Sequence, residues 1–131
     1  MKKISFLFVF VFTLFVTSMS TAQNNVAKPG LLDGANAVIN GVKGGEVNMD
    51  FLTANEILVD KAGYNVESFT LTLKIGEDLV SLTNTGNLLN ERQSTLVRKQ
   101  NPGDKVYIED IICKDKNGKT YSLPPMTFVI K

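Results

Sequence analysis

Three acidic residues, Asp104, Glu109 and Asp110, could act as general acid and base if they lined a common cleft. Acids spaced along a strand are far more often a solvated face, and the chain has no histidine to serve as the usual base. Neither Gly-x-Ser-x-Gly nor Ser-x-x-Lys occurs, and the glycines of residues 41–45 lack the Lys-Ser/Thr of a phosphate-binding loop. We therefore expect no enzyme, no catalytic residue and no cofactor.

A faint calcium-ligand pattern, Asp115-x-Asn117-Gly118, is the second place where residue types could do chemistry. An EF-hand would need a bidentate glutamate near position 126, where Met126 stands, and a helix on each side. The same residues form a common hairpin turn between two β-rich runs. We favour the turn and expect no metal site.

The single cysteine, Cys113, cannot form a disulfide within the chain. It is a free thiol, half of an intermolecular bridge, or a small buried hydrophobe. Because Cys113 follows Ile111 and Ile112 inside a predicted strand, we favour burial. An activating partner for a nucleophilic thiol is also missing, since its neighbours are Lys114 and Lys116.

The first 22 residues have the pattern of a cleavable export signal. Lys2 and Lys3 precede an uncharged apolar core, Ile4–Val16, that is too short to span a membrane, and Ser20-Thr21-Ala22 supplies small residues for cleavage after Ala22. We expect an exported protein, periplasmic or secreted, in which residues 1–22 are the signal, 23–35 a flexible lead and 36–131 one domain. No membrane span is expected after the signal is removed.

The charge balance excludes some classes of partner. The chain has 14 basic and 13 acidic residues, and removal of Lys2 and Lys3 leaves 12 against 13. Such a neutral surface gives no basic patch for nucleic acid or an anionic membrane.

The stretch from residue 101 to 131 supplies the scaffold that the rest of the chain must cover. Apolar runs on both sides of Asn117-Gly118 predict a hairpin with a type I′ turn, in which both central residues have positive φ. An isolated hairpin is marginal in water, so other elements must bury its apolar face. We expect Ile108 and Phe128 in that core. Of the aromatic residues Tyr107, Tyr121 and Phe128, exposed ones would mark a partner surface, although a core role is favoured for each.

The preceding segments also favour strands. We expect a short strand at Ala37–Ile39, a half-buried strand over Glu46–Phe51, and a strand buried on both faces at Ile57–Val59. A long strand over Tyr64–Ile75 changes parity near Glu67-Ser68, which predicts a β-bulge, and a second bulge is expected around Glu109-Asp110.

One helix is expected, over Asn90–Lys99. Asn90 can cap it, Gln93 completes a capping box, and Pro102-Gly103 ends it. With six to eight strands in about 109 residues, we predict an all-β fold. Its architecture is expected to be a two-layer, immunoglobulin-like sandwich with one short helix.

The order of features from residue 41 onward resembles the C-terminal domain of the gliding-motility protein GldM. Each motif is weak alone, and their shared order carries the resemblance. The matching features are, in chain order, Gly44-Gly45, Val47 to Val59, Tyr64 to Phe69, Gly86-Asn87, Leu89 to Val97 with Gln93, Gly103 to Ile111, Asn117-Gly118, Leu123-Pro124 and Met126 to Ile130.

This resemblance implies a periplasmic, non-enzymatic protein-interaction domain linked to gliding motility and type IX secretion. The chain departs from the family at the turn before the last strands, where Lys116 stands in place of the usual proline. We expect an exported stand-alone relative with a protein partner in the cell envelope; its binding residues and oligomeric state stay open. The alternatives are a small-ligand or glycan-binding β module, favoured by a deep apolar pocket, and last an enzyme that uses carboxylates. A long exposed strand edge would favour protein binding.

Overall fold

The computed structural model describes residues 29–131. The predicted signal, Met1–Ala22, and the first residues of the expected lead lie outside the described residues. In the described part, eight strands and two helices follow one another. The strands are β1 (Ala37–Val38), β2 (Gly44–Val47), β3 (Leu58–Val59), β4 (Tyr64–Ile75), β5 (Asp78–Thr85), β6 (Lys105–Asp115), β7 (Thr120–Leu123) and β8 (Met126–Ile130), and the helices are α2 (Met49–Ala54) and α3 (Glu91–Arg98).

Strand β6 is the centre of a six-stranded sheet, in which five strands have the order β2-β8-β6-β4-β5 and the sixth, β7, pairs with β6 alone. Its second half pairs with β7 and its first half with β8, both antiparallel, while β4 lies along its other edge. Pro124 and Pro125 separate β7 from β8, since proline cannot donate to the strand ladder. The C-terminal ribbon is thus central, as the sequence predicts.

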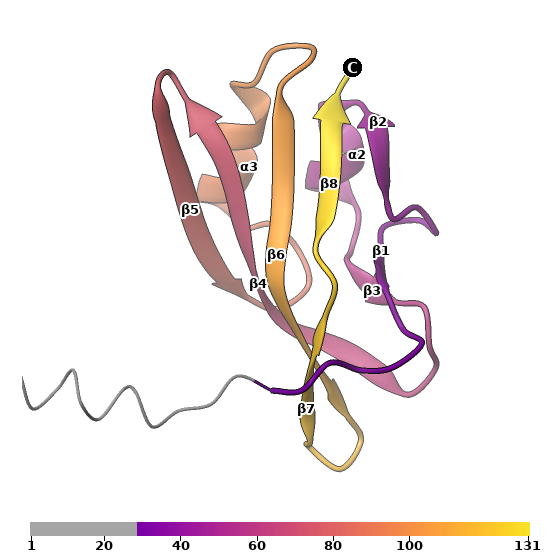
Figure 1. The fold of residues 1–131 in the computed structure, drawn as a ribbon. Coiled ribbons are helices and arrows are strands. Elements are labelled where there is room, and N and C mark those ends of the chain that lie inside the picture. Colours follow the sequence, from indigo (N-terminus) through magenta and orange to yellow (C-terminus); the bar gives the residue numbers. More distant parts are fainter. Residues whose placement is uncertain (1–28) are drawn as a thin grey trace, which may run out of the picture.

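A second layer covers one face of this sheet. Strands β1 and β3 form a two-stranded antiparallel sheet, and helices α2 and α3 lie beside it on the same face (Figure 1). The opposite face of the large sheet has no element over it in Figure 1. The fold class is confirmed: the protein is mostly β, with two sheets in two layers.

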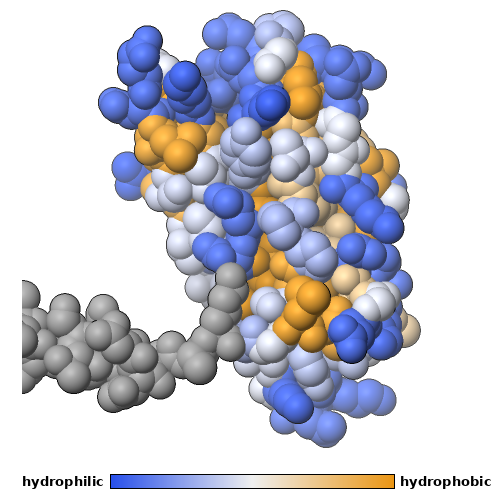
Figure 2. Space-filling model, in the orientation of Figure 1, coloured by the Kyte–Doolittle hydropathy of each residue, from blue (hydrophilic) through white to orange (hydrophobic). Residues whose placement is uncertain are grey.

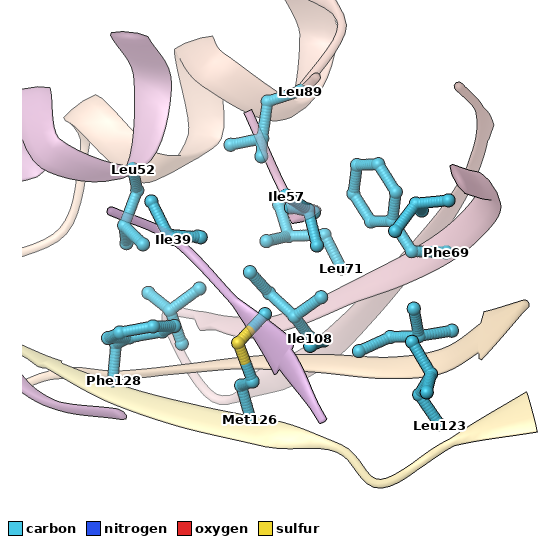
Figure 3. Close-up of a cluster of buried hydrophobic side chains, with 14 of the residues drawn as sticks. Ile39, Leu52, Ile57, Phe69, Leu71, Leu89, Ile108, Leu123, Met126 and Phe128 are labelled. Carbon is cyan, nitrogen blue, oxygen red and sulfur yellow. The ribbon is translucent and has the colours of Figure 1, made fainter. Parts of the chain in front are cut away.

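The core lies between the large sheet and the covering layer (Figure 3). Alternation in β4 sends Leu71 and Leu73 inward, and β6 contributes Val106 and Ile108 in the same way. Phe128 of β8 is fully buried, as expected. The fully buried large apolar side chains of the covering layer are Ile39, Leu52, Ile57 and Val97.

Both predicted bulges are present, at one point of the sheet. The register between β4 and β6 shifts on either side of Ser68, which pairs with Ile112, and Asp110 has a positive φ of 49°. These shifts let Val66 and Phe69 both face the core although they are three residues apart.

The strand predicted over Glu46–Phe51 is wrong from Asn48 onward. Strand β2 ends at Val47, and helix α2 begins after Asn48, whose side chain accepts a 3.0 Å hydrogen bond from the Phe51 N–H. This cap satisfies one of the unpaired amides at the helix start. Val47, Met49 and Phe51 alternate with polar residues as in a strand, but Val47 is the last residue of β2 and the other two belong to helix α2.

The predicted burial of Ile57–Val59 on both faces is also wrong. Ile57 is fully buried, but Leu58 is 48% exposed and Val59 is half-buried. The strand belongs to the covering layer, which has only one face against the core.

The hairpin turn is in the predicted place but has a different type. Gly118 has φ of 88°, whereas Asn117 is not among the residues with positive φ. The N–H of Gly118 bonds to the Asp115 carbonyl oxygen, and Asp115 also pairs with Lys119, which makes a three-residue loop. The Asp115 carboxylate stabilises it by accepting the N–H groups of Asn117 and Lys119 at 2.9 and 3.0 Å.

The folded region begins before residue 36. Leu32 and Ala35 are buried, and the N–H of Leu32 bonds to the carbonyl oxygen of Ser122 in β7. None of the helices within residues 29–131 has the length and hydropathy that crossing a membrane requires.

Candidate interaction surface

The three acids considered for catalysis do not share a cleft. The Asp104 carboxylate accepts the N–H of Asn101 at 2.7 Å and caps the turn before β6. Glu109 lies further along β6 opposite Thr70, and Asp110 sits at the bulge. Only Asp104 of the three lines the cavity described below. This geometry gives no acid–base pair.

The Asp115-Asn117-Gly118 pattern is used by the turn itself. The Asp115 oxygen that a cation would need accepts two backbone N–H groups instead. In residues 29–131, no three His, Cys, Asp or Glu side chains come together as a metal-binding group.

Cys113 is fully buried in β6, which confirms the predicted burial. Removal from water disfavours the thiolate and raises the pKa of the Cys113 thiol, and the charge of Asp115 adds to this rise. Its register partners are Val66 and Tyr121. The thiol is therefore a core group and is not activated for chemistry.

The aromatic residues divide between core and surface. Phe128 is in the core, and Tyr121 packs edge-to-face with Tyr64 at a centroid distance of 5.7 Å. Lysines lie over both tyrosine rings, Lys61 at 5.9 Å and Lys119 at 5.4 Å from the centroids. Tyr107 is different, because it is half-buried on the uncovered face of the large sheet.

That uncovered face, here called the open face, has regular rows of polar and small side chains. In Figure 2 hydrophilic and hydrophobic residues are interspersed across it. Two pairs of hydroxyls join β4 to β5 there, Thr70 with Thr83 at 2.9 Å and Thr72 with Ser81 at 2.8 Å. Strand register gives one complete row across the sheet as Ser81, Thr72, Tyr107, Thr127 and Gly44. Next to this row, Leu79 pairs with Lys74 on one side of the sheet, and Lys105, Val129 and Glu46 follow one another on the other side.

A shallow cavity of about 260 Å³ lies on the open face near the β4–β5 hairpin. Its lining comes from β4, β5 and the start of β6, and consists of Lys74, Leu79, Gly103, Asp104, Lys105 and Tyr107. Lys74 and Lys105 each lie one residue beyond the Leu73–Val106 pair of the β4–β6 ladder, and both line this cavity. Two lysine side chains therefore line one small cavity.

Strand β5 forms one edge of the large sheet, and Figure 1 shows no element beyond it. The hairpin from β4 has a two-residue turn closed by the Ile75–Asp78 pair, which in this type of hairpin exchanges backbone hydrogen bonds. Along an antiparallel ladder, pairs that exchange backbone hydrogen bonds alternate with pairs that do not. At the other end of the same ladder the N–H of Gly86 bonds to the Glu67 carbonyl oxygen, which fits this alternation counted from the turn. The backbone groups that point away from β4 are those of Leu79, Ser81, Thr83 and Thr85.

Within residues 29–131 these outward groups have no hydrogen-bond partner. The strand also lacks the usual protection of an edge, since residues 78–85 contain no lysine, no proline and no bulge. Leu79, on the open face, is 69% exposed. An eight-residue strand edge is thus available for pairing.

The other edge strand, β2, is a poorer surface for pairing. It has four residues and two of them are glycines, Gly44 and Gly45. Gly45 has φ of 104°, which is not an extended strand conformation. The long exposed edge is therefore β5.

The fold and this surface define a small, mostly β domain with a free strand edge next to an open sheet face. A family model described as the GldM C-terminal domain matches residues 53–131. The match covers more than half of the chain, and the protein belongs to the GldM C-terminal domain family. A search of curated proteins found no match to this chain.

Of the residues that line the cavity, the sequence singles out only Asp104, as a catalytic candidate that is not favoured, and Tyr107, for which a core role is favoured. The alternation of Thr and Ser in β4 and β5 can be seen in the sequence, but it does not predict which strand lies at the edge of the sheet. The juxtaposition of Lys74 with Lys105 depends on a register between segments 31 residues apart. A like-charge pair of this kind becomes visible only when β4 and β6 are placed side by side.

Proposed function

We propose that this protein is an exported, non-enzymatic interaction module that binds a protein partner by strand addition at β5. The observation that supports this proposal is the free edge of β5 with its four outward-facing residues. A partner segment in extended conformation would complete their hydrogen bonds and become the next strand of the sheet. The main chain would supply affinity, and the side chains next to the edge would supply specificity.

The rigidity of β5 favours such binding. The hydroxyl pairs to β4 hold its open face, and from the covered side Gln93 of α3 donates a 2.8 Å hydrogen bond to the Leu82 carbonyl oxygen. A preorganised edge loses little conformational freedom when a partner strand docks.

The family gives the proposal its cellular setting. Membership of the GldM C-terminal domain family supports a role in envelope machinery for gliding motility or type IX secretion. We propose that the partner is a protein of that machinery, and that export places the domain in the periplasm or outside the cell.

The alternative, a small-ligand or glycan-binding module, has less support. The cavity of about 260 Å³ is smaller than most ligand pockets, which span about 300–1,000 Å³ and bury most of the ligand. It is also open to solvent along the sheet face and lined by charged residues. It therefore differs from the deep apolar pocket that would favour this alternative.

A pull-down from envelope extracts with matched variants tests strand addition. Thr83→Pro removes an outward-facing N–H of β5, whereas Thr83→Val keeps that N–H and loses the same hydroxyl pair with Thr70. We expect the natural protein and Thr83→Val to capture the same envelope protein and Thr83→Pro to lose it. Both variants must give the far-UV spectrum of the natural protein. Equal capture by all three proteins would contradict binding at this edge.

A further inference from the structure

Strand addition at β5 uses the backbone of the edge and gives no role to the cavity beside Leu79. Lys74 and Lys105 each lie next to a residue of the Leu73–Val106 pair on the neighbouring strands β4 and β6, and both line the cavity, where like charges repel. Within residues 29–131 neither ammonium group has an ion-pair partner, and the ion pair found in this part of the chain joins Lys114 to Glu67, elsewhere in the domain. Such an arrangement favours the arrival of an anion.

Asp104, the acidic residue in the lining of the cavity, does not neutralise both lysines. The Asp104 carboxylate is held by the N–H of Asn101 at 2.7 Å, and the lining side chains together carry two positive charges against one negative charge. Tyr107 and Leu79 give the cavity an aromatic and an apolar wall beside the two lysines.

We infer that this cavity receives an acidic side chain of the protein strand that pairs with β5. The inference rests on the proposed function and names the chemistry of the partner. Leu79 is both the first outward-facing residue of the edge and a wall of the cavity, so a paired strand passes directly beside it.

The distances allow such a contact. A partner backbone would lie two interstrand spacings of about 4.8 Å from that of Lys74, with Leu79 between them. A partner side chain opposite Leu79 points over the same open face. A glutamate at that position and the long side chain of Lys74 together cover this gap, and Lys105 lines the same cavity. The partner is therefore an acidic extended segment.

Peptides that differ in one charge test the inference. Two octapeptides of alternating valine and threonine would be titrated into the ¹⁵N-labelled protein at low salt, one with glutamate and one with glutamine at a single position of the threonine face. We expect the glutamate peptide to shift amides of β5 and of Lys74, and to bind roughly fivefold more tightly, the upper end for one exposed ion pair. In Lys74→Gln and Lys105→Gln the two peptides should bind alike.

Other outcomes overturn the inference in distinguishable ways. Equal affinity of the two peptides, with shifts along β5, would leave strand addition standing and reject the carboxylate site. Failure of the glutamate peptide to bind at millimolar concentration would also reject it, while the pull-down with Thr83→Pro decides the proposed function separately. Binding of an oligogalacturonate at Lys74 and Lys105, without shifts in β5, would assign the cavity to an acidic glycan instead.

Discussion

Gln93 Nε2 donates a 2.8 Å hydrogen bond to the backbone carbonyl oxygen of Leu82, which joins helix α3 to the edge strand β5. The same side chain closes the capping box, because its Oε1 accepts the N–H of Asn90 while the Asn90 side chain accepts the N–H of Gln93. One fully buried glutamine thus satisfies the helix start and fixes the strand that we propose binds the partner.

Replacement of this glutamine should destabilise the domain more than replacement of a second buried glutamine. Gln93→Met removes the bonds to Leu82 and Asn90, and we expect a loss of about 1–3 kcal/mol. Gln100 is also buried, but its Oε1 has no partner in the described residues and its Nε2 makes one 3.3 Å bond to Leu96. Gln100→Met should change the free energy of unfolding by less than about 1 kcal/mol. Chemical denaturation compares them, and equal losses would contradict the role of Gln93.

The C-terminal hairpin gives the second prediction. Gly118 has φ of 88° and open space where a Cβ would lie, so a side chain there suffers backbone strain without a clash. Gly118→Val should cost about 1–3 kcal/mol, and Gly118→Asn less, because asparagine tolerates this region. Chemical denaturation compares the two variants. Nearly equal shifts of the denaturation midpoint for valine and asparagine would show that the loop changes its backbone conformation to accommodate either side chain.

Substitutions along the same ribbon separate core from surface. Ile108→Ala and Phe128→Ala should each cost about 2–5 kcal/mol, since both side chains are fully buried. Lys114→Ala should cost less than about 1 kcal/mol, because its 3.0 Å ion pair with Glu67 is exposed to solvent. If the core variants leave the denaturation midpoint unchanged, the ribbon is not the centre of the fold.

The parallel pairing of β2 with β8 depends on one glycine. A Cβ on Gly44 would stand 2.7 Å from the carbonyl oxygen of Thr127, so the two strands would have to separate. We expect Gly44→Ala to destabilise the domain by about 1–3 kcal/mol. The matched control is Gly30→Ala, where a Cβ meets nothing within 4 Å and the reduced freedom of the unfolded chain should leave stability equal or slightly higher. Equal unfolding midpoints for the two variants would contradict the close approach.

Acid pH should weaken the link between β1 and β3. The pKa of Asp60 is lowered, chiefly because its carboxylate accepts the backbone N–H of Asn36 at 2.6 Å, with Lys43 as a smaller contribution. A lowered pKa in the folded state means that this stabilisation is complete above the ordinary aspartate pKa of about 3.9 and is lost as pH falls through the lower value.

Asp60→Asn isolates this contribution. The difference in melting temperature between the natural protein and the variant should be constant from neutral pH to about pH 5 and should shrink below about pH 4. A difference that stays constant down to pH 2 would show that the carboxylate charge has no part in the link.

The sequence predicts well those features that short segments determine. The capping box of Asn90 and Gln93 involves residues three apart, and the bulge near Ser68 follows from the changed parity between Val66 and Phe69. Helix α2 is missed because its first residues continue the alternation of β2, although Asn48 is a recognisable N-cap.

The interaction surface cannot be predicted in this way. It depends on which strands lie at the edges and on the parallel pairing of β2 with β8, which joins segments more than 80 residues apart. Neither the free groups of β5 nor the lysine pair has a local sequence pattern. Local preference forms the strands, whereas packing of the covering layer selects their order.

The reactivity of Cys113 provides the last prediction, because this residue reports on opening of the sheet centre. Cys113 is fully buried in β6 between β4 and β7, and burial raises its thiol pKa, so both access and thiolate content are low in the folded state. A disulfide reagent such as dithionitrobenzoate can then react only when the strands open. We expect the reaction at neutral pH to be at least about 100-fold slower in buffer than in denaturant, as for a group exposed by cooperative opening. The Phe128→Ala variant should react faster than the natural protein, since a less stable core opens more often. Equal rates in buffer and in denaturant would place the thiol at the surface and restore covalent pairing between chains as an explanation for it.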